Sequence, residues 1–237
     1  MIKSAEINYI SIDDELQPLF AEVSLWGAHI LDLGCGNASL SRRMALETAA
    51  KQVVAIECDR ALLAQAARHG LPNLSVAYGE AQSLPYPEEH FDVVTMFKSL
   101  HHVPIDCMQR ALKECARVLK PSGIFFVLEP VYAGPFNDLV KLFHDEGYVR
   151  GKALDNLQWA QENGVFSLKK KKYYRVPVSF ASFADFKNKI IYASGNEVYA
   201  LDGPRYQEIK SCYASHQDSS GRTRFERPIS VHILSKV

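Results

Sequence analysis

The stretch of residues 30–40 limits the fold of this chain more than any other part of the sequence. It reads Ile-Leu-Asp-Leu-Gly-Cys-Gly-Asn-Ala-Ser-Leu, so an apolar run ends at two glycines and a helical pattern follows. This order predicts a strand, a tight turn and the start of a helix. Gly34 and Gly36 allow backbone conformations that other residues avoid, and a helix start leaves N–H groups unpaired. The turn therefore suits a nucleotide-like ligand, although a Gly-x-Gly turn can also be a tight corner and nothing more.

Strands and helices alternate along most of the chain. The expected strands are 29–33, 52–56, 74–78, 91–97, 124–128, 173–180 and 229–234. The expected helices are 13–26, 39–50, 60–69, 105–119, 136–147, 153–163 and 183–216. Continuous apolar strands are typical of a parallel sheet that is covered on both faces, and right-handed crossovers make such a sheet doubly wound. We therefore predict an α/β fold with a doubly wound, mainly parallel seven-stranded sheet and helical insertions toward the C-terminus.

Composition narrows the classes of function. The chain has 237 residues with 27 basic and 27 acidic side chains, which gives no general attraction to nucleic acid or to an anionic membrane. No apolar stretch is long enough to span a bilayer and the N-terminal residues do not resemble a leader, so we expect a cytoplasmic location. The five cysteines contain no Cys-x-x-Cys pair. We expect reduced thiols, no disulfide framework and no metal site.

Two acidic residues point to an adenosine ligand. Glu57 ends the second expected strand, about 20 residues after the glycine turn, where dinucleotide-binding folds place a carboxylate that accepts hydrogen bonds from ribose hydroxyls. A nicotinamide-binding turn would have a third glycine, but Ser39 stands at that position and Asp32 lies two residues before the first glycine. These differences weaken the prediction of a dehydrogenase.

Four blocks follow one another in order. They are Ile-Leu-Asp-Leu-Gly-Cys-Gly-Asn at 30–37, Val-Val-Ala-Ile-Glu-Cys-Asp at 53–59, Gly-Glu-Ala-Gln-Ser-Leu-Pro-Tyr at 79–86 with Phe-Asp-Val-Val at 91–94, and Arg-Val-Leu-Lys-Pro-Ser-Gly at 117–123. Over residues 30–130 the chain resembles the class I S-adenosylmethionine-dependent methyltransferases, and in particular their type 11 group, which acts on small molecules. This resemblance implies a Rossmann-like fold. Ala38 stands where the family often has a third glycine, and Ser122 replaces the first glycine of the usual Pro-Gly-Gly. We expect altered turn geometry at both positions, with binding retained.

The resemblance also implies S-adenosyl-L-methionine as cofactor and S-adenosyl-L-homocysteine as product. Gly34 and Gly36, with Cys35 between them, would make room for the methionine part of the cofactor. Asp32 would fix the turn or reach the methionine ammonium through water. Glu57 would hold both ribose hydroxyls.

The resemblance places the adenine and the ammonium at two further segments. Glu80 would accept a hydrogen bond from the adenine amino group, the N–H of Ala81 would donate to the ring, and Cys58 would offer an apolar wall to the base. The carbonyl of Phe97 would face the methionine ammonium. The competing interpretation of Glu80 is a turn acid in an exposed loop.

Methyl transfer does not always need a base. A carboxylate acceptor is already anionic at pH 7, whereas a hydroxyl or an acidic carbon needs a proton acceptor near the methyl group. His101 and His102, after the fourth expected strand, are the catalytic candidates, although a hydrogen-bonded core histidine is the competing interpretation for one of them. Residues that could touch or line an acceptor site are Lys98, Glu129, Tyr132, the aromatic residues Tyr9, Trp159, Phe166, Tyr192, Tyr199 and Tyr206, and the arginines Arg150, Arg175 and Arg205.

We predict a single methyltransferase domain over residues 1–237. Its parts are an N-terminal helical cover (1–27), a cofactor-binding core (28–130), a helical elaboration or substrate lid (131–222) and a last strand (223–237). It would methylate a small organic acceptor at oxygen or carbon, with no nucleic acid or membrane partner, as a monomer or homodimer. The alternatives are a non-catalytic partner or sensor protein with the same fold and, less favoured, an NAD(P)-dependent oxidoreductase.

Overall fold

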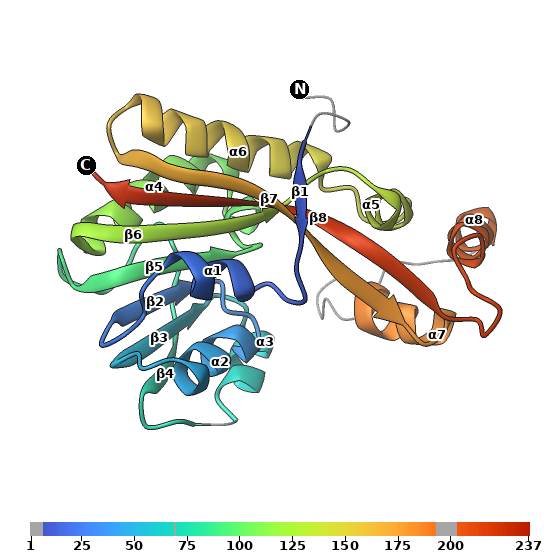
Figure 1. The fold of residues 1–237 in the computed structure, drawn as a ribbon, viewed down its shortest axis with the longest axis horizontal. Helices are drawn as coiled ribbons and strands as arrows, with labels where there is room; N and C mark the ends of the chain where they lie inside the picture. Colours follow the sequence, from blue (N-terminus) through green and yellow to red (C-terminus); the bar gives the residue numbers. More distant parts are fainter. Residues whose placement is uncertain (1–6, 69, 193–202) are drawn as a thin grey trace. The chain divides into compact units, whose positions relative to one another are not determined.

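The computed structural model describes residues 7–68, 70–192 and 203–237 (Figure 1). These residues form two compact units. The unit that we call the core unit contains residues 15–130, 149–172 and 230–237. The accessory unit contains residues 131–148, 173–229 and those before residue 15. Strands β7 and β8 contribute residues to both units, so the chain passes from one unit to the other within continuous strands.

The sequence pattern places most elements correctly. The strands are β1 (Tyr9–Ser11), β2 (His29–Leu33), β3 (Gln52–Glu57), β4 (Leu74–Tyr78), β5 (Phe91–Phe97), β6 (Leu119–Pro130), β7 (Phe166–Phe180) and β8 (Thr223–Lys236). The helices are α1 (Gln17–Glu22), α2 (Ser39–Glu47), α3 (Arg60–Ala66), α4 (Met108–Val118), α5 (Pro135–Val140), α6 (Gly147–Glu162), α7 (Phe183–Phe186) and α8 (Gly203–Ala214). Short 3-10 turns η2 (Leu100–His102) and η3 (Ile105–Cys107) precede α4, and a π-helix η4 (Lys187–Ile191) follows α7.

The order of the strands locates the ligand-binding edge of the sheet. That order is β1-β7-β8-β6-β5-β2-β3-β4. Strand β2 pairs in parallel with β3 on one side and β5 on the other, so the chain reverses its direction of progress across the sheet at β2. In doubly wound sheets ligands bind at such a switch point, beyond the carboxyl ends of the strands. The end of β2, where the glycine turn begins, is therefore the expected binding edge.

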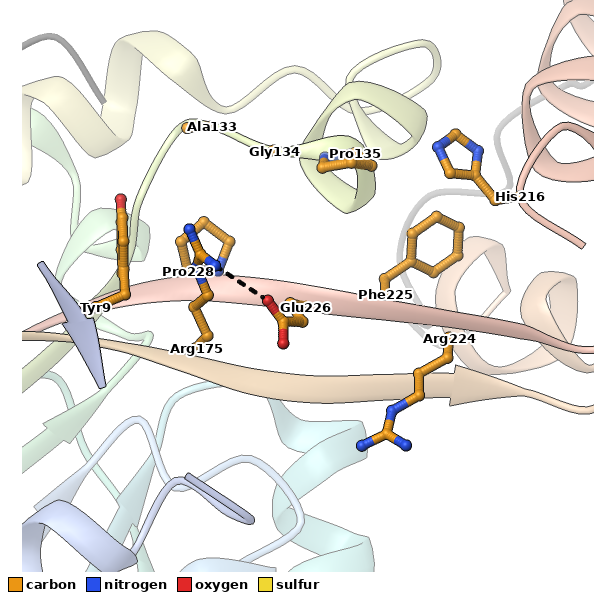
Figure 2. Close-up of a pocket in the computed structure, with 10 residues that line it drawn as sticks. All are labelled: Tyr9, Ala133, Gly134, Pro135, Arg175, His216, Arg224, Phe225, Glu226 and Pro228. Atoms are coloured by element: carbon orange, nitrogen blue, oxygen red, sulfur yellow. Dashed lines mark hydrogen bonds and ion pairs between the residues drawn. The ribbon is translucent and has the colours of Figure 1, made fainter. Parts of the chain in front are cut away.

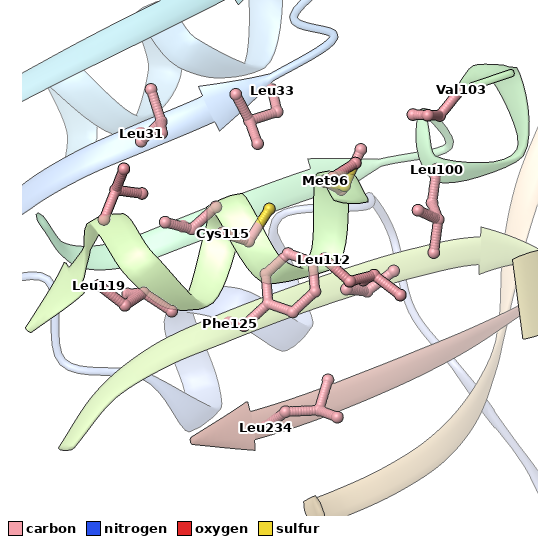
Figure 3. Close-up of a cluster of buried hydrophobic side chains, with 14 of the residues drawn as sticks. Leu31, Leu33, Met96, Leu100, Val103, Leu112, Cys115, Leu119, Phe125 and Leu234 are labelled. Carbon is pink, nitrogen blue, oxygen red and sulfur yellow. The ribbon is translucent and has the colours of Figure 1, made fainter. Parts of the chain in front are cut away.

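The predicted α/β fold with a doubly wound sheet is confirmed, but the number of strands was wrong. The described residues form an eight-stranded sheet, because β1, a three-residue strand, pairs in parallel with β7. A strand this short has no periodicity that a sequence pattern could reveal. The last strand, β8, lies between β6 and β7, and Figure 3 shows the strand with Leu234 running opposite to the strand with Phe125.

Helices cover both faces of the sheet in the core unit. One face packs on α4 through a large cluster of buried residues that includes Leu31, Phe125 and Leu112 (Figure 3). Leu157 of α6 belongs to the same cluster. Residues of the opposite face alternate with these, and there Ala55 of β3 packs against the start of α2 and against α3. This alternation follows from the two-residue period of a strand. It leaves the β2–α2 turn at the end of a sheet that is buried on both faces.

The accessory unit has a separate, largely aromatic core. Phe136, Phe180, Phe186, Tyr213 and Phe225 are buried against one another. The rings of Phe180 and Phe186 meet edge to face, with 5.2 Å between centroids, which is a favourable arrangement for aromatic pairs. Four elements, α5, β7, α7 and α8, bring these rings together with β8.

Some helices are shorter than predicted. The helix expected over 13–26 is limited to Gln17–Glu22, because Pro18 lies in its first turn and Val23 is extended. The helix expected over 183–216 is divided into α7, η4 and α8; its residues 193–202 lie outside the described part of the chain, as do His69 and Tyr199. Among the described helices, none combines the length and the apolar composition that crossing a membrane requires.

The expectation of altered turn geometry at Ala38 and Ser122 was wrong. Ala38 has a φ of +57° and Ser122 a φ of +62°, which are left-handed conformations that glycine adopts easily. Both turns therefore keep a glycine-like backbone, and each side chain adds strain of about 1–2 kcal/mol.

Candidate cofactor site

The turn between β2 and α2 contains two glycines that differ in their surroundings. Gly34 and Gly36 have φ values of +70° and +58°. A Cβ on Gly34 would lie 2.5 Å from the Cβ of Ser99, so a side chain does not fit there. A Cβ on Gly36 would meet no described atom within 4 Å. Packing therefore requires the first glycine, whereas the second leaves open space in which a ligand can approach the backbone.

Glu57 holds this turn against the end of β3. Its Oε2 accepts a hydrogen bond from the N–H of Gly36 at 2.7 Å, and its Oε1 accepts from the N–H groups of Cys58 and Asp59, each at 2.8 Å. The side chain is buried, with a residue exposure of 6%. A carboxylate has roughly four lone-pair positions, so these bonds leave Oε2 able to accept from a further donor. Sequence reasoning located Glu57 but missed that it also stabilises the glycine turn.

Asp32 has a structural role beneath the turn. Its Oδ2 accepts from the hydroxyl of Ser41 at 2.5 Å and its Oδ1 accepts from the hydroxyl of Thr95 at 2.8 Å. The pairing of Asp32 with Thr95 in neighbouring parallel strands brings these two groups together. Burial raises the pKa of Asp32 to about 6, although both hydroxyl bonds act in the opposite direction. Of the two roles expected for Asp32, these contacts correspond to fixing the turn, since they join β2 to α2 and β5.

The residues expected at the adenine end lie after β4 and β3. Glu80 is exposed, and its carboxylate accepts from the amide of Gln82 at 2.7 Å and from the hydroxyl of Tyr78 at 3.4 Å. Ala81 is half-buried and packs against the core cluster, while the side chain of Cys58 is exposed. The Glu80 carboxylate is therefore accessible to a ligand as well as to its neighbours.

Lys98, directly after β5, forms an ion pair with Glu15. Phe97 is buried against Phe126, with 5.4 Å between ring centroids, and its carbonyl lies at the carboxyl end of the strand. The next residue, Lys98, has a φ of +56° and places its Nζ 2.7 Å and 2.6 Å from the two carboxylate oxygens of Glu15. The charge of Lys98 is thus balanced by an acid, which weakens its role as an attractor of an anionic acceptor.

The two histidines after β5 differ in environment. His101 is buried and its Nδ1 bonds to Glu129, whose other carboxylate oxygen accepts from the N–H of Leu100 at 2.9 Å. His102 is exposed, and its ring centroid lies 4.1 Å from that of His101. The structure thus places His101 as the hydrogen-bonded core histidine that the sequence left as an alternative. Sequence reasoning had not predicted Glu129 as its partner.

The remaining acceptor candidates are divided between the two units. Arg150, Trp159 and Phe166 belong to the core unit, and Phe166 stacks on Phe125 in the buried cluster. Tyr9, Tyr132, Arg175, Tyr192, Arg205 and Tyr206 belong to the accessory unit. What the structure brings together at the edge of the sheet is the set of Asp32, Gly34, Gly36 and Glu57.

Comparison with known proteins agrees with this geometry. Residues 30–123 match the family model described as a methyltransferase domain. A ubiquinone biosynthesis O-methyltransferase of Coxiella burnetii is 30% identical over 162 residues, which are 61% of this chain and 66% of that protein. A 27-O-demethylrifamycin SV methyltransferase of Amycolatopsis mediterranei is 34% identical over 146 residues, 56% of this chain and 51% of that protein. The chain therefore matches less than two thirds of the length of these curated relatives.

A solved structure extends the similarity of fold over nearly the whole chain. The crystal structure of a candidate methyltransferase from Bacillus halodurans C-125 has a TM-score of 0.65 and covers 94% of this chain and 98% of its own. Its sequence identity is 20%, so this likeness concerns the fold alone. The family match over residues 30–123 and the curated relatives show a methyltransferase domain in this part of the chain, in agreement with the resemblance of its ordered blocks to class I S-adenosylmethionine-dependent methyltransferases.

Proposed function

We propose that this protein transfers a methyl group from S-adenosylmethionine to an oxygen atom of a small organic molecule. The observation that carries the proposal is the carboxylate of Glu57, which is bonded to Gly36 beside open space at the switch point of the sheet. The relatives support the choice of oxygen, since one is named for O-methylation in ubiquinone biosynthesis and another for a 27-O-demethylated rifamycin.

The residues of the edge fit an adenosine-containing sulfonium. Glu57 can accept from a ribose hydroxyl through Oε2, Glu80 can accept from the adenine amino group, and the open side of Gly36 admits the methionine part. The N–H of Ala81 and the side chain of Cys58 would contact the base, Cys35 would lie in the turn beside the methionine part, and the carbonyl of Phe97 would face the ammonium. When bound, S-adenosylmethionine supplies an electrophilic methyl group. The task of the protein is to exclude water and to align the acceptor oxygen with that group.

A hydroxyl acceptor also needs a proton acceptor. We assign the role of proton acceptor to His102 because it is exposed, whereas the ring of His101 is buried and bonded to Glu129. His101 and Glu129 then act as positioning residues, since they fix the η2 turn that presents His102. A carboxylate acceptor would make His102 unnecessary, because it is already ionised at pH 7.

The cofactor site is best tested with Glu80, because Glu57 also stabilises the fold. Glu80→Ala removes an exposed carboxylate whose partners, among the described residues, are two neighbouring side chains. Loss of a hydrogen bond to a charged group costs about 1.5–3 kcal/mol, so the Kd for S-adenosylmethionine should rise about 10- to 100-fold in a calorimetric titration. Glu88→Ala, which removes another exposed acid eight residues further along, is the matched control and should leave the Kd unchanged. Equal affinity in the Glu80 and wild-type proteins would contradict the assignment.

A screen of acceptors follows once binding is measured. We expect methylation of phenols, quinols or small acids by the full chain, detected as formation of S-adenosylhomocysteine. Cofactor binding without turnover of any of these classes, together with a stable protein complex, would favour the alternative of a non-catalytic partner or sensor.

A further inference from the structure

The accessory unit contains a cavity that the proposed cofactor site does not use. It has a volume of about 340 Å³, and all of its lining residues belong to the accessory unit. Figure 2 shows Arg175 and Tyr9 at one end and His216 at the other, with Pro135 and Phe225 between them. A volume of this size is at the small end of the range for ligand pockets, so it suits a compound with one or two rings.

A guanidinium held in place by an aromatic ring marks the first end. The Cζ of Arg175 lies 4.7 Å from the ring centroid of Tyr9, within the range for a cation–π contact. Pairing of β1 with β7 explains this stack, because it aligns Tyr9 with Tyr173, two residues before Arg175. Stacking limits the movement of the guanidinium, so less entropy is lost when it binds an anion.

Most N–H donors of the Arg175 guanidinium remain available to a ligand. Among the described residues its ion-pair partner is Glu226, whose Oε2 lies 3.4 Å from Nη1, while the two side chains are 48% and 55% exposed. Such an exposed and long ion pair contributes little. A guanidinium has five N–H donors arranged as a fork that fits a carboxylate, and one weak contact leaves most of them available.

The other end of the cavity presents the exposed residues Pro135 and His216. The ring of His216 packs on the buried ring of Phe225, with 5.1 Å between their centroids. The Nδ1 of His216 lies 2.9 Å from the carbonyl oxygen of Cys212 and 3.1 Å from the hydroxyl oxygen of Ser215. Rings and prolines around a 340 Å³ space favour a planar aromatic group over a flexible chain.

We propose that this cavity binds a planar aromatic carboxylate, with the carboxylate on the guanidinium of Arg175 and the ring against the exposed residues His216 and Pro135. The site is assigned on the residues of the accessory unit alone and goes beyond the proposed methyl transfer. Of the three arginines that the sequence analysis offered for an acceptor site, Arg175 is the one that lines this cavity, together with Arg224.

The probe is 2-naphthoate, titrated into the full chain by calorimetry or by saturation-transfer NMR without S-adenosylmethionine. We expect a Kd on the order of 0.1–1 mM, which is typical for a ligand of this size. The neutral isostere 2-naphthamide and the ring-free anion acetate should each bind at least tenfold more weakly, because each lacks one half of the recognised group.

Variants distinguish specific binding in this cavity from a general attraction of the anion to positive charge on the protein. Arg175→Met should weaken 2-naphthoate at least tenfold, and Arg175→Lys should weaken it several-fold because the charge remains but the fork and the stack are lost. Glu226→Gln should strengthen binding two- to fivefold, since it removes the competing carboxylate. Arg205→Met, which removes an exposed arginine of α8 outside the cavity, is the control and should change the Kd less than twofold.

Two results would overturn the proposal. One is the absence of 2-naphthoate binding to a folded wild-type chain that binds S-adenosylmethionine normally. The other is binding that Arg175→Met and Arg205→Met weaken equally. Because the titration needs no cofactor, its failure is distinct from a failure of the proposed methyl transfer.

Discussion

The stability of this protein should depend on pH through one buried histidine of β8. His232 is 4% exposed, and neither of its ring nitrogens has a hydrogen-bond partner among the described residues. Burial, with a smaller contribution from the positive charge of Lys171, lowers the pKa of His232 to about 4 from its ordinary value of 6.5. The folded protein therefore holds this ring neutral at pH values at which the unfolded chain protonates it.

The sign and size of the effect follow from this difference. Above about pH 6.5 both states are neutral at this residue, so it has no pH-dependent effect. As the pH falls from about 6.5 to about 4, His232 binds a proton in the unfolded state but not in the folded state, so the free energy of unfolding decreases. The full difference between the two pKa values corresponds to roughly 3 kcal/mol, of which about 2 kcal/mol is reached at pH 5.

The assay compares the wild-type protein with His232→Leu by urea denaturation, monitored by far-UV circular dichroism at pH 7.5 and pH 5. Leucine has no titrating group, so the variant should gain about 2 kcal/mol relative to the wild-type protein between the two pH values, whatever its stability at pH 7.5. All other titrating groups are shared and cancel in this difference. Parallel pH profiles for the two proteins would refute the conclusion that the ring is buried and neutral.

Three further predictions concern the site and its turns. Asp32→Asn should remove a pH dependence of the opposite sign. Because the pKa of Asp32 is raised to about 6, the wild-type protein should lose about 1 kcal/mol of stability relative to the variant as the pH rises from 5 to 7.5. The same denaturation series measures this, and equal pH dependence in the two proteins would contradict it. Ser122→Gly should raise the free energy of unfolding by about 0.5 kcal/mol, because the relief of left-handed backbone strain at this exposed residue outweighs the greater conformational entropy that glycine gives the unfolded chain. Ser122→Ala keeps the strain and should not change the free energy of unfolding. An equal effect of the two changes would argue against strain. With a hydroxyl acceptor, His102→Ala should lower kcat about 100-fold and remove the fall in kcat at low pH that protonation of a general base causes. The Kd for S-adenosylmethionine should stay unchanged. An unaltered kcat would exclude His102 as the base.

The sequence predicted best what short-range patterns determine. The strands 29–33, 74–78 and 91–97 were predicted at their observed bounds, because apolar runs between turn residues have few alternative structures. Glu57 was located from the strand that it ends. Its bond to Gly36 could not be predicted, since it depends on how side chains from two different strands meet across the sheet.

Other features depend on contacts between residues far apart in the chain. Asp32 meets Thr95 only because β5 pairs with β2, and His101 meets Glu129 because β6 ends beside η2. The backbone at Ala38 and Ser122 keeps the conformation that glycine would have, which shows that the surrounding fold overrides the local preference of a residue. The cavity of the accessory unit combines residues from β1, β7 and β8, so no single segment revealed it.

The central claim, that the edge of the sheet at β2 and β3 binds S-adenosylmethionine, is tested most directly by calorimetric titration of the purified full chain. Parallel titrations with S-adenosylhomocysteine and NAD complete the measurement. We predict micromolar binding of the two sulfur-containing compounds at one site and no binding of NAD. Absence of binding by both to a folded protein, or binding of NAD in their place, would contradict the claim.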